Sequence, residues 1–212
     1  MVAAVAGTLS ATEVTWYSGA VNTTLADNSA AGSTFTTAGG TWSGSPDAPI
    51  DVSVILNISG GYNGDLYGYL VYNDGTSAKT EILLNRVGGG SGSLVASTAG
   101  FGGGATTDFA SLKTAGVTLA DGRSNPGIQT TAAAAGQSYS SDGSSLNTTF
   151  TGMAGNGTWT LFLADMSAGD QSTLVSWGLD ISVVPEPVTY ALGIFGGAMA
   201  LLVLGCRIAR QN

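Results

Sequence analysis

Hydrophobic and polar residues alternate along several short stretches of the chain. Over residues 50–59 one face of the pattern holds Val52, Val54, Leu56 and Ile58, and the other holds Asp51, Ser53, Ile55 and Asn57. A period of two is typical of a β-strand, because successive side chains point to opposite faces. Similar alternation occurs over residues 66–72, 81–84, 158–165 and 174–183, each bounded by Gly, Asn, Asp or Ser.

Amphipathic helical periodicity of useful length is lacking before residue 188. Many short strands separated by turn residues favour two sheets packed face to face over a single helical or mixed domain. The pattern therefore predicts an all-β fold, an antiparallel β-sandwich, for most of the chain.

One segment near the C-terminus differs in kind from the strands. Residues 188–206 contain no charged residue, and Arg207 and Arg210 follow them. As a helix this segment would measure about 28 Å, close to the roughly 30 Å hydrocarbon core of a bilayer. We therefore expect a single C-terminal transmembrane helix; a buried core helix is the alternative. The basic flank predicts a cytoplasmic C-terminus and an external domain before the helix.

Pro185, Glu186 and Pro187 stand directly before this segment. Two prolines oppose regular secondary structure and keep the backbone extended and accessible. With Val184, the apolar segment and the Arg-containing end, the motif resembles the PEP-CTERM sorting signal of Gram-negative bacteria. The resemblance implies a protein exported and held at the inner membrane, then cut near the motif by a membrane-embedded exosortase and displayed in the cell envelope or among exopolysaccharide. A proline linker before a permanent anchor is the alternative.

The chain thus divides into three predicted parts. Residues 1–11 are interpreted as the remnant of a signal peptide, although they lack a basic n-region. Residues 12–184 form the β-sandwich ectodomain, and residues 185–212 form the sorting signal.

Two stretches of the ectodomain carry a second resemblance. YNGDLYGYLVYNDGT (62–76), followed by LLNRVGG (83–89), and NGTWTLFLADMSAGDQSTLVSWGLDI (156–181) are similar to the two halves of the P domain (P/Homo B domain) that accompanies proprotein convertases. The similarity extends over residues 50–181, with a divergent middle rich in Gly, Ala, Ser and Thr. It implies a jelly-roll-like sandwich. Trp159 and Trp177, on strands of the second half, are expected in the core with their indole N–H groups bonded to backbone.

Composition narrows the classes of function. The chain has no histidine and one cysteine, which excludes histidine-based catalytic triads, His-ligated zinc and an intrachain disulfide. It has 14 acidic and 6 basic residues, and a net charge of −8 disfavours nucleic acid as a partner. We expect a protein that is not an enzyme. Glycoside hydrolysis by paired carboxylates needs no histidine and is the alternative, but the sequence selects no such pair.

Acidic residues in turns form one candidate site. Because calcium takes six to eight oxygen ligands and some P domains bind it, Asp65, Asp108, Asp165 and Asp170 are candidate calcium ligands if folding brings them to one rim. For Asp65, Asp165 and Asp170, hydrogen bonding to turn amides is the alternative role. The fold requires no cofactor in principle, and calcium is the cofactor for which the sequence offers ligands.

Tyrosines form a second candidate site. Tyr62, Tyr67, Tyr69 and Tyr72 would stack on sugar rings if their side chains share an exposed strip, whereas ordinary cross-strand packing is the alternative. The leading hypothesis is a non-catalytic exported protein with a structural or adhesive role. The second is a calcium-assisted carbohydrate-binding module of the exopolysaccharide matrix.

Overall fold

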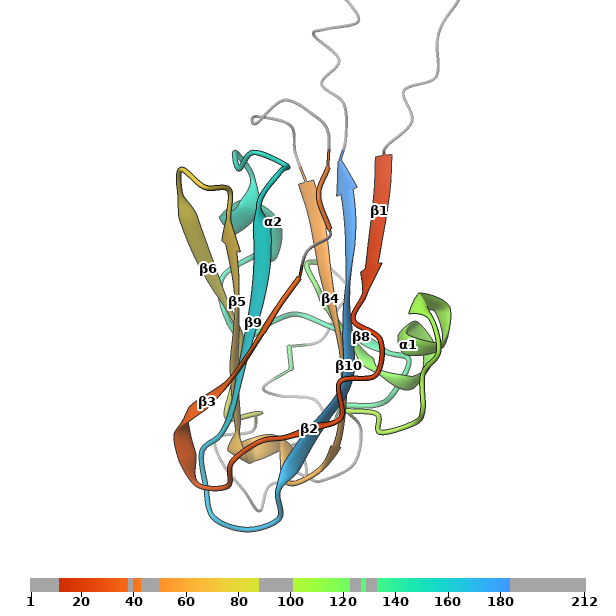
Figure 1. Cartoon of the computed structure of the whole chain (residues 1–212), viewed down its shortest axis with the longest axis vertical. Coiled ribbons are helices and arrows are strands. Elements are labelled where there is room, and N and C mark those ends of the chain that lie inside the picture. The colour runs from red at the N-terminus through yellow and green to blue at the C-terminus, as the bar shows by residue number, and fades with distance from the viewer. Residues whose placement is uncertain are drawn as a thin grey trace, which may run out of the picture.

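Two β-sheets face each other across a common hydrophobic core (Figure 1). The computed structural model describes residues 12–37, 40–42, 50–87, 101–122, 127–128 and 133–183. Its elements are β1 (Thr12–Tyr17), β2 (Thr23–Thr24), β3 (Ser29–Thr36), β4 (Ile50–Gly60), the 3-10 helix η1 (Asn63–Asp65), β5 (Leu66–Asn73), β6 (Ala78–Asn85), α1 (Phe109–Ala115), β7 (Val117–Ala120), β8 (Ser138–Tyr139), α2 (Leu146–Phe150), β9 (Thr158–Asp165) and β10 (Ser172–Val183).

The first sheet, here called sheet A, has the order β1-β10-β4-β7-β8, and β2 pairs with β10 beside β1. All of its named pairings are antiparallel except β7 with β8. The second, sheet B, has the order β3-β9-β5-β6 and is antiparallel throughout. These pairings confirm the predicted all-β sandwich.

The core lies between the two inner faces. On β4 the predicted inner residues Val52, Val54, Leu56 and Ile58 are all buried in it. Trp159 on β9 is fully buried and its indole N–H donates to the Gly40 carbonyl at 3.0 Å, as expected of a core tryptophan. Trp177 on β10 is also buried and contacts the ring of Trp16 edge-on, with centroids 4.8 Å apart.

The five strands predicted from alternation are all present, as β4, β5, β6, β9 and β10. Two short helices were not predicted. Each has a side-chain cap that compensates for its weak apolar pattern: Asp108 and Ser111 form a capping box at α1, and the Ser145 hydroxyl accepts from the Thr148 amide at α2.

Some of the sequence predictions lie outside the described residues. They are the signal-peptide remnant at 1–11, Pro185, Glu186, Pro187, Arg207, Arg210 and the helix predicted over 188–206. Within the described ranges, no helix is long and apolar enough to cross a membrane.

Candidate functional site

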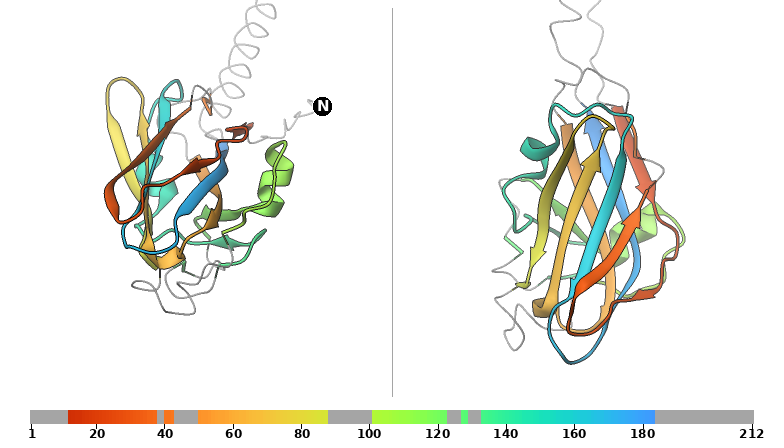
Figure 2. Two further views of the ribbon diagram at one scale, coloured as in Figure 1. Left: turned by 60° about the horizontal axis from the view of Figure 1, so that its bottom comes forward. Right: turned by 60° about the vertical axis from the view of Figure 1, so that its left-hand side comes forward.

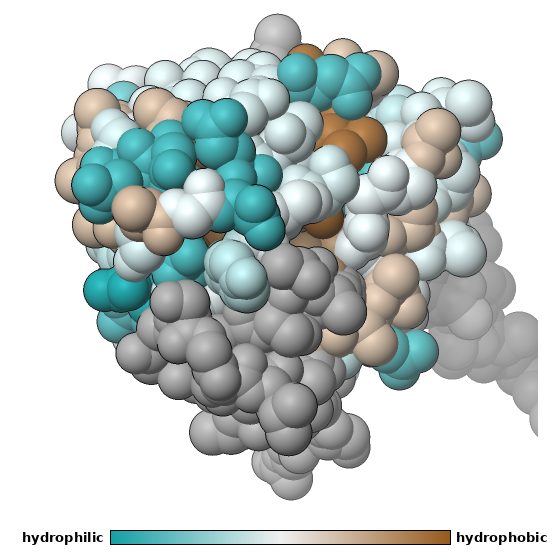
Figure 3. All heavy atoms as spheres, turned by 90° about the horizontal axis from the view of Figure 1, so that it is seen from below, coloured by the Kyte–Doolittle hydropathy of each residue, from teal (hydrophilic) through white to brown (hydrophobic). Residues whose placement is uncertain are grey.

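Three aspartates approach one another at the end of the sandwich that lies lowest in Figure 1. Asp65 ends η1, Asp165 ends β9, and Asp27 lies in the turn between β2 and β3. Strand pairing fixes this arrangement, because Asp165 is opposite both Ser29 of β3 and Leu66 of β5. We call Asp27, Asp65, Asp165 and the adjoining Ser172 the acidic cluster. Figure 3 looks onto this end, where strongly hydrophilic surface gathers on one side.

Most of the acidic cluster is buried. Asp65 is 1% exposed, Asp165 and Ser172 are fully buried, and Asp27 is half-buried. Among the residues that the structure describes, the buried Oδ1 atoms of the three aspartates and the Ser172 hydroxyl have no hydrogen-bond partner. Buried polar atoms are normally paired, so several together require a structural or functional explanation.

Some of the charge in the acidic cluster is already compensated. Arg86 Nη2 lies 4.0 Å from Asp65 Oδ1, and the same nitrogen donates to the Ser167 hydroxyl at 2.6 Å. The Ser172 amide donates to Asp165 Oδ2 at 3.1 Å, and the Gly169 amide to Asp27 Oδ2 at 3.3 Å. The partly exposed guanidinium of Arg86 therefore lies near the carboxyl group of Asp65, one of the three carboxyl groups in the cluster.

This environment alters proton binding at Asp165. Burial raises the pKa of Asp165, the Ser172 hydrogen bonding acts against this rise, and the charges of Asp65 and Asp27 add to it. The carboxyl group is thus more stable when it is protonated or when further positive charge lies nearby.

Folding brings together two of the four predicted calcium ligands, Asp65 and Asp165. Asp170 is exposed in the turn between β9 and β10. Asp108 is exposed at the start of α1, where its carboxylate accepts from the Ser111 amide at 2.8 Å and serves as a helix cap. Hydrogen bonding to a backbone amide is thus the role observed for Asp108.

Asp27 and Ser172 were not predicted from the sequence. Asp27 precedes the resemblance to the P domain, and Ser172 lies on a strand with no sign that its hydroxyl is buried. Only the pairing of β3 with β9, and the short connection from β9 to β10, bring them to Asp165.

The oxygen chemistry of the acidic cluster fits calcium, a cation that prefers carboxylate, carbonyl and hydroxyl oxygens. Its geometry fits less well, because the described part of the chain has no group of three or more His, Cys, Asp or Glu side chains that could hold a metal ion. A cation here would therefore depend on Asp65, Asp165 and neutral oxygens such as that of Ser172.

The tyrosines divide between two faces of sheet B. Tyr67 and Tyr69 alternate on the outer face of β5, where Tyr69 stacks on Phe162 of β9 with ring centroids 4.6 Å apart. Tyr67 contacts both rings edge-on. Figure 2 shows, in its right-hand view, that neither of the described α-helices lies over this face. Phe162 was not predicted as part of this strip, although it lies three residues from Trp159 on β9 and so on the other face of the sheet.

Tyr72 does not belong to this outer surface. It is fully buried on the inner face, because it lies an odd number of residues from Tyr67 and Tyr69. Its hydroxyl donates to the Ala154 carbonyl at 2.5 Å and accepts from the Gly157 amide at 2.7 Å. Burial accordingly raises the pKa of Tyr72. Tyr62 is also apart from the strip, in the loop before η1 near Gly169.

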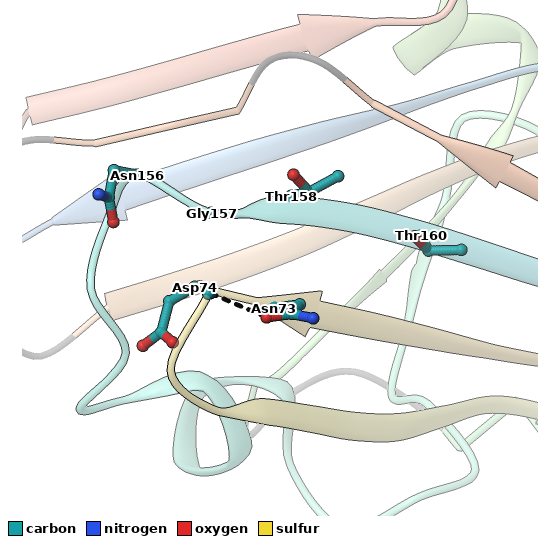
Figure 4. A pocket seen from close by; sticks show the side chains of 7 residues that line it. Asn73, Asp74, Asn156, Gly157, Thr158 and Thr160 are labelled. Atoms are coloured by element: carbon teal, nitrogen blue, oxygen red, sulfur yellow. Dashed lines mark hydrogen bonds between the residues drawn. The ribbon is translucent and has the colours of Figure 1, made fainter.

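A hollow of about 370 Å³ opens at the other end of the same sheet (Figure 4). Its walls come from the end of β5, the β5–β6 turn and the start of β9. Asp74 accepts amide hydrogen bonds from Thr76, Ser77 and Ala154, which hold its pKa below the usual range. The residues lining the hollow are Asn73, Asp74, Gly75, Asn156, Gly157, Thr158 and Thr160.

Comparisons with known proteins give little further guidance. No model of a known protein family matches the chain, and no curated protein matches it. Among solved structures, it is similar to the crystal structure of the Aeromonas sobria serine protease in complex with its chaperone, at 15% identity and a TM-score of 0.42. That similarity covers 82% of this chain but only 28% of the other. It is too low to carry an argument about activity or family.

Proposed function

We propose that this chain is a non-catalytic exported protein with a structural or adhesive role in the cell envelope or extracellular matrix. In this proposal the sandwich has the jelly-roll-like topology of a P domain, residues 188–206 cross the inner membrane, and an exosortase cuts near Pro185–Pro187. The basis is the sequence motif together with the way the last strand ends.

The end of β10 is the observation that carries the proposal. β10 pairs with β1 on one side and with β4 on the other, and Val183 is opposite Thr12 and Ile50. Its last residue directly precedes the Val184–Pro187 motif. Cleavage at the motif would therefore leave both neighbours of β10, and the core between the sheets, intact.

Expression of the full chain with and without an exosortase tests the proposal. We expect the sandwich in the membrane fraction without the enzyme, and a shortened product in the medium or envelope with it. Glu186→Ala should keep the chain in the membrane fraction in both hosts, while Glu13→Ala, at an exposed position on β1, should behave like the unaltered chain. Membrane retention of the unaltered chain in both hosts would contradict processing.

A calcium-assisted carbohydrate-binding module is the second candidate, supported by the buried oxygens of the acidic cluster that accept no hydrogen bond from the described residues. Asp65, Asp165 and Ser172 would hold the ion. Bound calcium would supply positive charge that balances the carboxylates and would join the end of β9 to the start of β10. Ligands that bind only the folded state raise its stability.

Thermal unfolding with calcium or with EDTA tests this candidate. Because the folded-state pKa of Asp165 is raised, its stabilising contribution is present below the unfolded pKa and is lost as pH rises through the folded value. In EDTA, we expect stability to fall over that window in the unaltered chain and to fall less in Asp165→Asn.

Calcium should restore stability at neutral pH in the unaltered chain but not in Asp165→Asn. Asp170→Asn, at an exposed turn position, serves as the matched control and should respond like the unaltered chain. An identical melting temperature in calcium and in EDTA would exclude the calcium site.

A further inference from the structure

We propose that the outer face of sheet B, from the hollow to the Tyr69–Phe162 stack, binds a neutral, hydroxyl-rich polysaccharide chain. We call this surface the sheet B face. The inference rests on the adhesive function proposed above and names the class of ligand that such a function would use.

The hollow provides the polar part of the sheet B face. Its volume of about 370 Å³ lies within the usual range of small-ligand sites, roughly 300–1,000 Å³. Asn156 contributes a side-chain amide and Thr158 a hydroxyl. Asn73 adds its amide nitrogen, since its Oδ1 accepts from the Gly75 amide, and the Thr160 hydroxyl is shared with the Thr36 hydroxyl at 3.1 Å. Amides and hydroxyls both donate and accept hydrogen bonds, as the hydroxyls of a sugar do.

The walls of the hollow are fixed before any ligand arrives. Asp74 ties the β5–β6 turn to Ala154 through an amide hydrogen bond of 3.2 Å. The buried Tyr72 hydroxyl bridges the Ala154 carbonyl and the Gly157 amide. A side chain at position 157 would collide with the Asn73 backbone, since a Cβ there would lie 2.3 Å from that carbonyl oxygen. Fixed walls reduce the ordering cost of binding.

The aromatic part lies further along the same two strands. Thr158, Thr160 and Phe162 alternate on the outer side of β9, opposite Asn73, Val71 and Tyr69 of β5. From Thr158 to Phe162 the strand advances about 13 Å, at roughly 3.3 Å per residue. An extended ligand lying along β5 and β9 would meet hydrogen-bonding groups first and then aromatic rings, which bury apolar surface such as the C–H side of a sugar ring.

The charges of the protein favour a neutral ligand. The protein has a formal charge of −8, and the one ionisable side chain that lines the hollow is Asp74. Both Asp74 oxygens accept amide hydrogen bonds, so they are engaged by the turn itself. A polyanion would find repulsion here and no cation among the residues that line the hollow.

The distribution of side chains also argues against a protein partner. Protein interfaces concentrate aromatic anchors near a dry centre with a polar rim around them. On the sheet B face the rings lie at one end and the polar hollow at the other, which suits an elongated ligand better than a compact one. A second copy of the chain is the competing occupant that the experiment must detect.

Affinity electrophoresis of the full chain in detergent tests the inference. The gels contain hydroxyethyl cellulose, dextran or galactomannan as neutral probes and alginate as the polyanionic probe. We expect at least one neutral probe to retard the protein and alginate not to. Tyr69→Ala and Thr158→Glu should each raise the dissociation constant by about tenfold or more, equivalent to about 1.4 kcal/mol.

Two matched controls accompany these variants. Tyr62→Ala removes a tyrosine at the opposite end, and Thr114→Glu adds the same charge at an exposed position of α1; both should bind like the unaltered chain. Thr158 is exposed, so Thr158→Glu reports on binding even if Tyr69→Ala loses stability, and thermal unfolding verifies the fold of each variant.

The inference would be overturned by no retardation by any neutral probe, by unchanged binding in folded Thr158→Glu, or by retardation by alginate alone. A concentration-dependent dimer in gel filtration that Thr158→Glu abolishes would assign the face to a second copy and would also overturn it. If the chain still reaches the envelope or medium by exosortase processing without binding glycans, this inference fails while the proposed export and processing stand.

Discussion

The outer faces of the two sheets are covered in different ways. On sheet A, residues 101–116 and α1 cover the face, so that Ile55 of β4 and Leu112 of α1 are both fully buried outside the main core. On sheet B, Tyr67, Tyr69 and Phe162 are only half-buried and pack on one another, and neither α1 nor α2 lies over them (Figure 2).

Side-chain size explains the difference. Gly178 of β10 leaves room for α1, since a Cβ there would lie 2.7 Å from Leu112 Cδ2. Polar groups then fasten the covering segment: Asn57 donates to the Gly104 carbonyl at 2.8 Å, and the Ser176 and Thr106 hydroxyls are 2.7 Å apart. Small residues leave room for a covering element to pack closely. Large aromatic side chains instead cover a sheet by themselves and leave their rings partly accessible.

Leu112→Ala should have the largest effect on stability, because it removes a fully buried side chain that packs between α1 and sheet A. We expect a loss of about 2–5 kcal/mol in the free energy of unfolding, typical of a buried leucine. The matched change on the sheet B face, Ile82→Ala at a half-buried position, should cost about 1 kcal/mol or less. Urea denaturation measures both, and equal losses would contradict the contrast between the two faces.

Gly178→Ala should have the next largest effect. The added methyl group would meet Leu112 Cδ2 at 2.7 Å and the Trp16 carbonyl oxygen at 2.8 Å, so α1 or β1 must shift. Overpacking of this kind typically costs about 1–3 kcal/mol. Thr158→Ala, exposed on the sheet B face, should stay within about 0.5 kcal/mol of the unaltered chain. Thermal unfolding of the two variants measures the difference. Unchanged stability in Gly178→Ala would show that α1 does not pack closely on this glycine.

Asp108→Ala should have the smallest effect and should depend on pH. The Ser111 amide, and then its hydroxyl, hold the pKa of Asp108 below the usual range. Its contribution is therefore present above the unfolded pKa and is lost as pH falls through the lowered folded value. Hydrogen exchange of the α1 amides should rise in Asp108→Ala at neutral pH and converge with the unaltered chain in acid. Parallel exchange rates at all pH values would contradict the role of this cap.

Of the features of the candidate sites, the face of the sheet on which each strand residue lies was the most open to prediction from the sequence. The alternation over residues 66–72 separates Tyr72 from Tyr67 and Tyr69, and the alternation over 158–165 puts Phe162 on the outer side. Grouping four tyrosines by their proximity in the chain overlooked this signal. The acidic cluster was less accessible, because Asp27 is 138 residues away from Asp165.

The sequence by itself determined the two-sheet architecture, the inner residues of the long strands and the absence of histidine-based chemistry. Those properties follow from local periodicity and composition, which need no knowledge of how strands pair. Only the tertiary structure decided that residues 101–116 cover sheet A, that the described helices leave the outer face of sheet B uncovered, and that Asp27 and Ser172 join Asp165. Such outcomes depend on contacts between residues distant in the chain, which strand order and register establish and which no local pattern encodes.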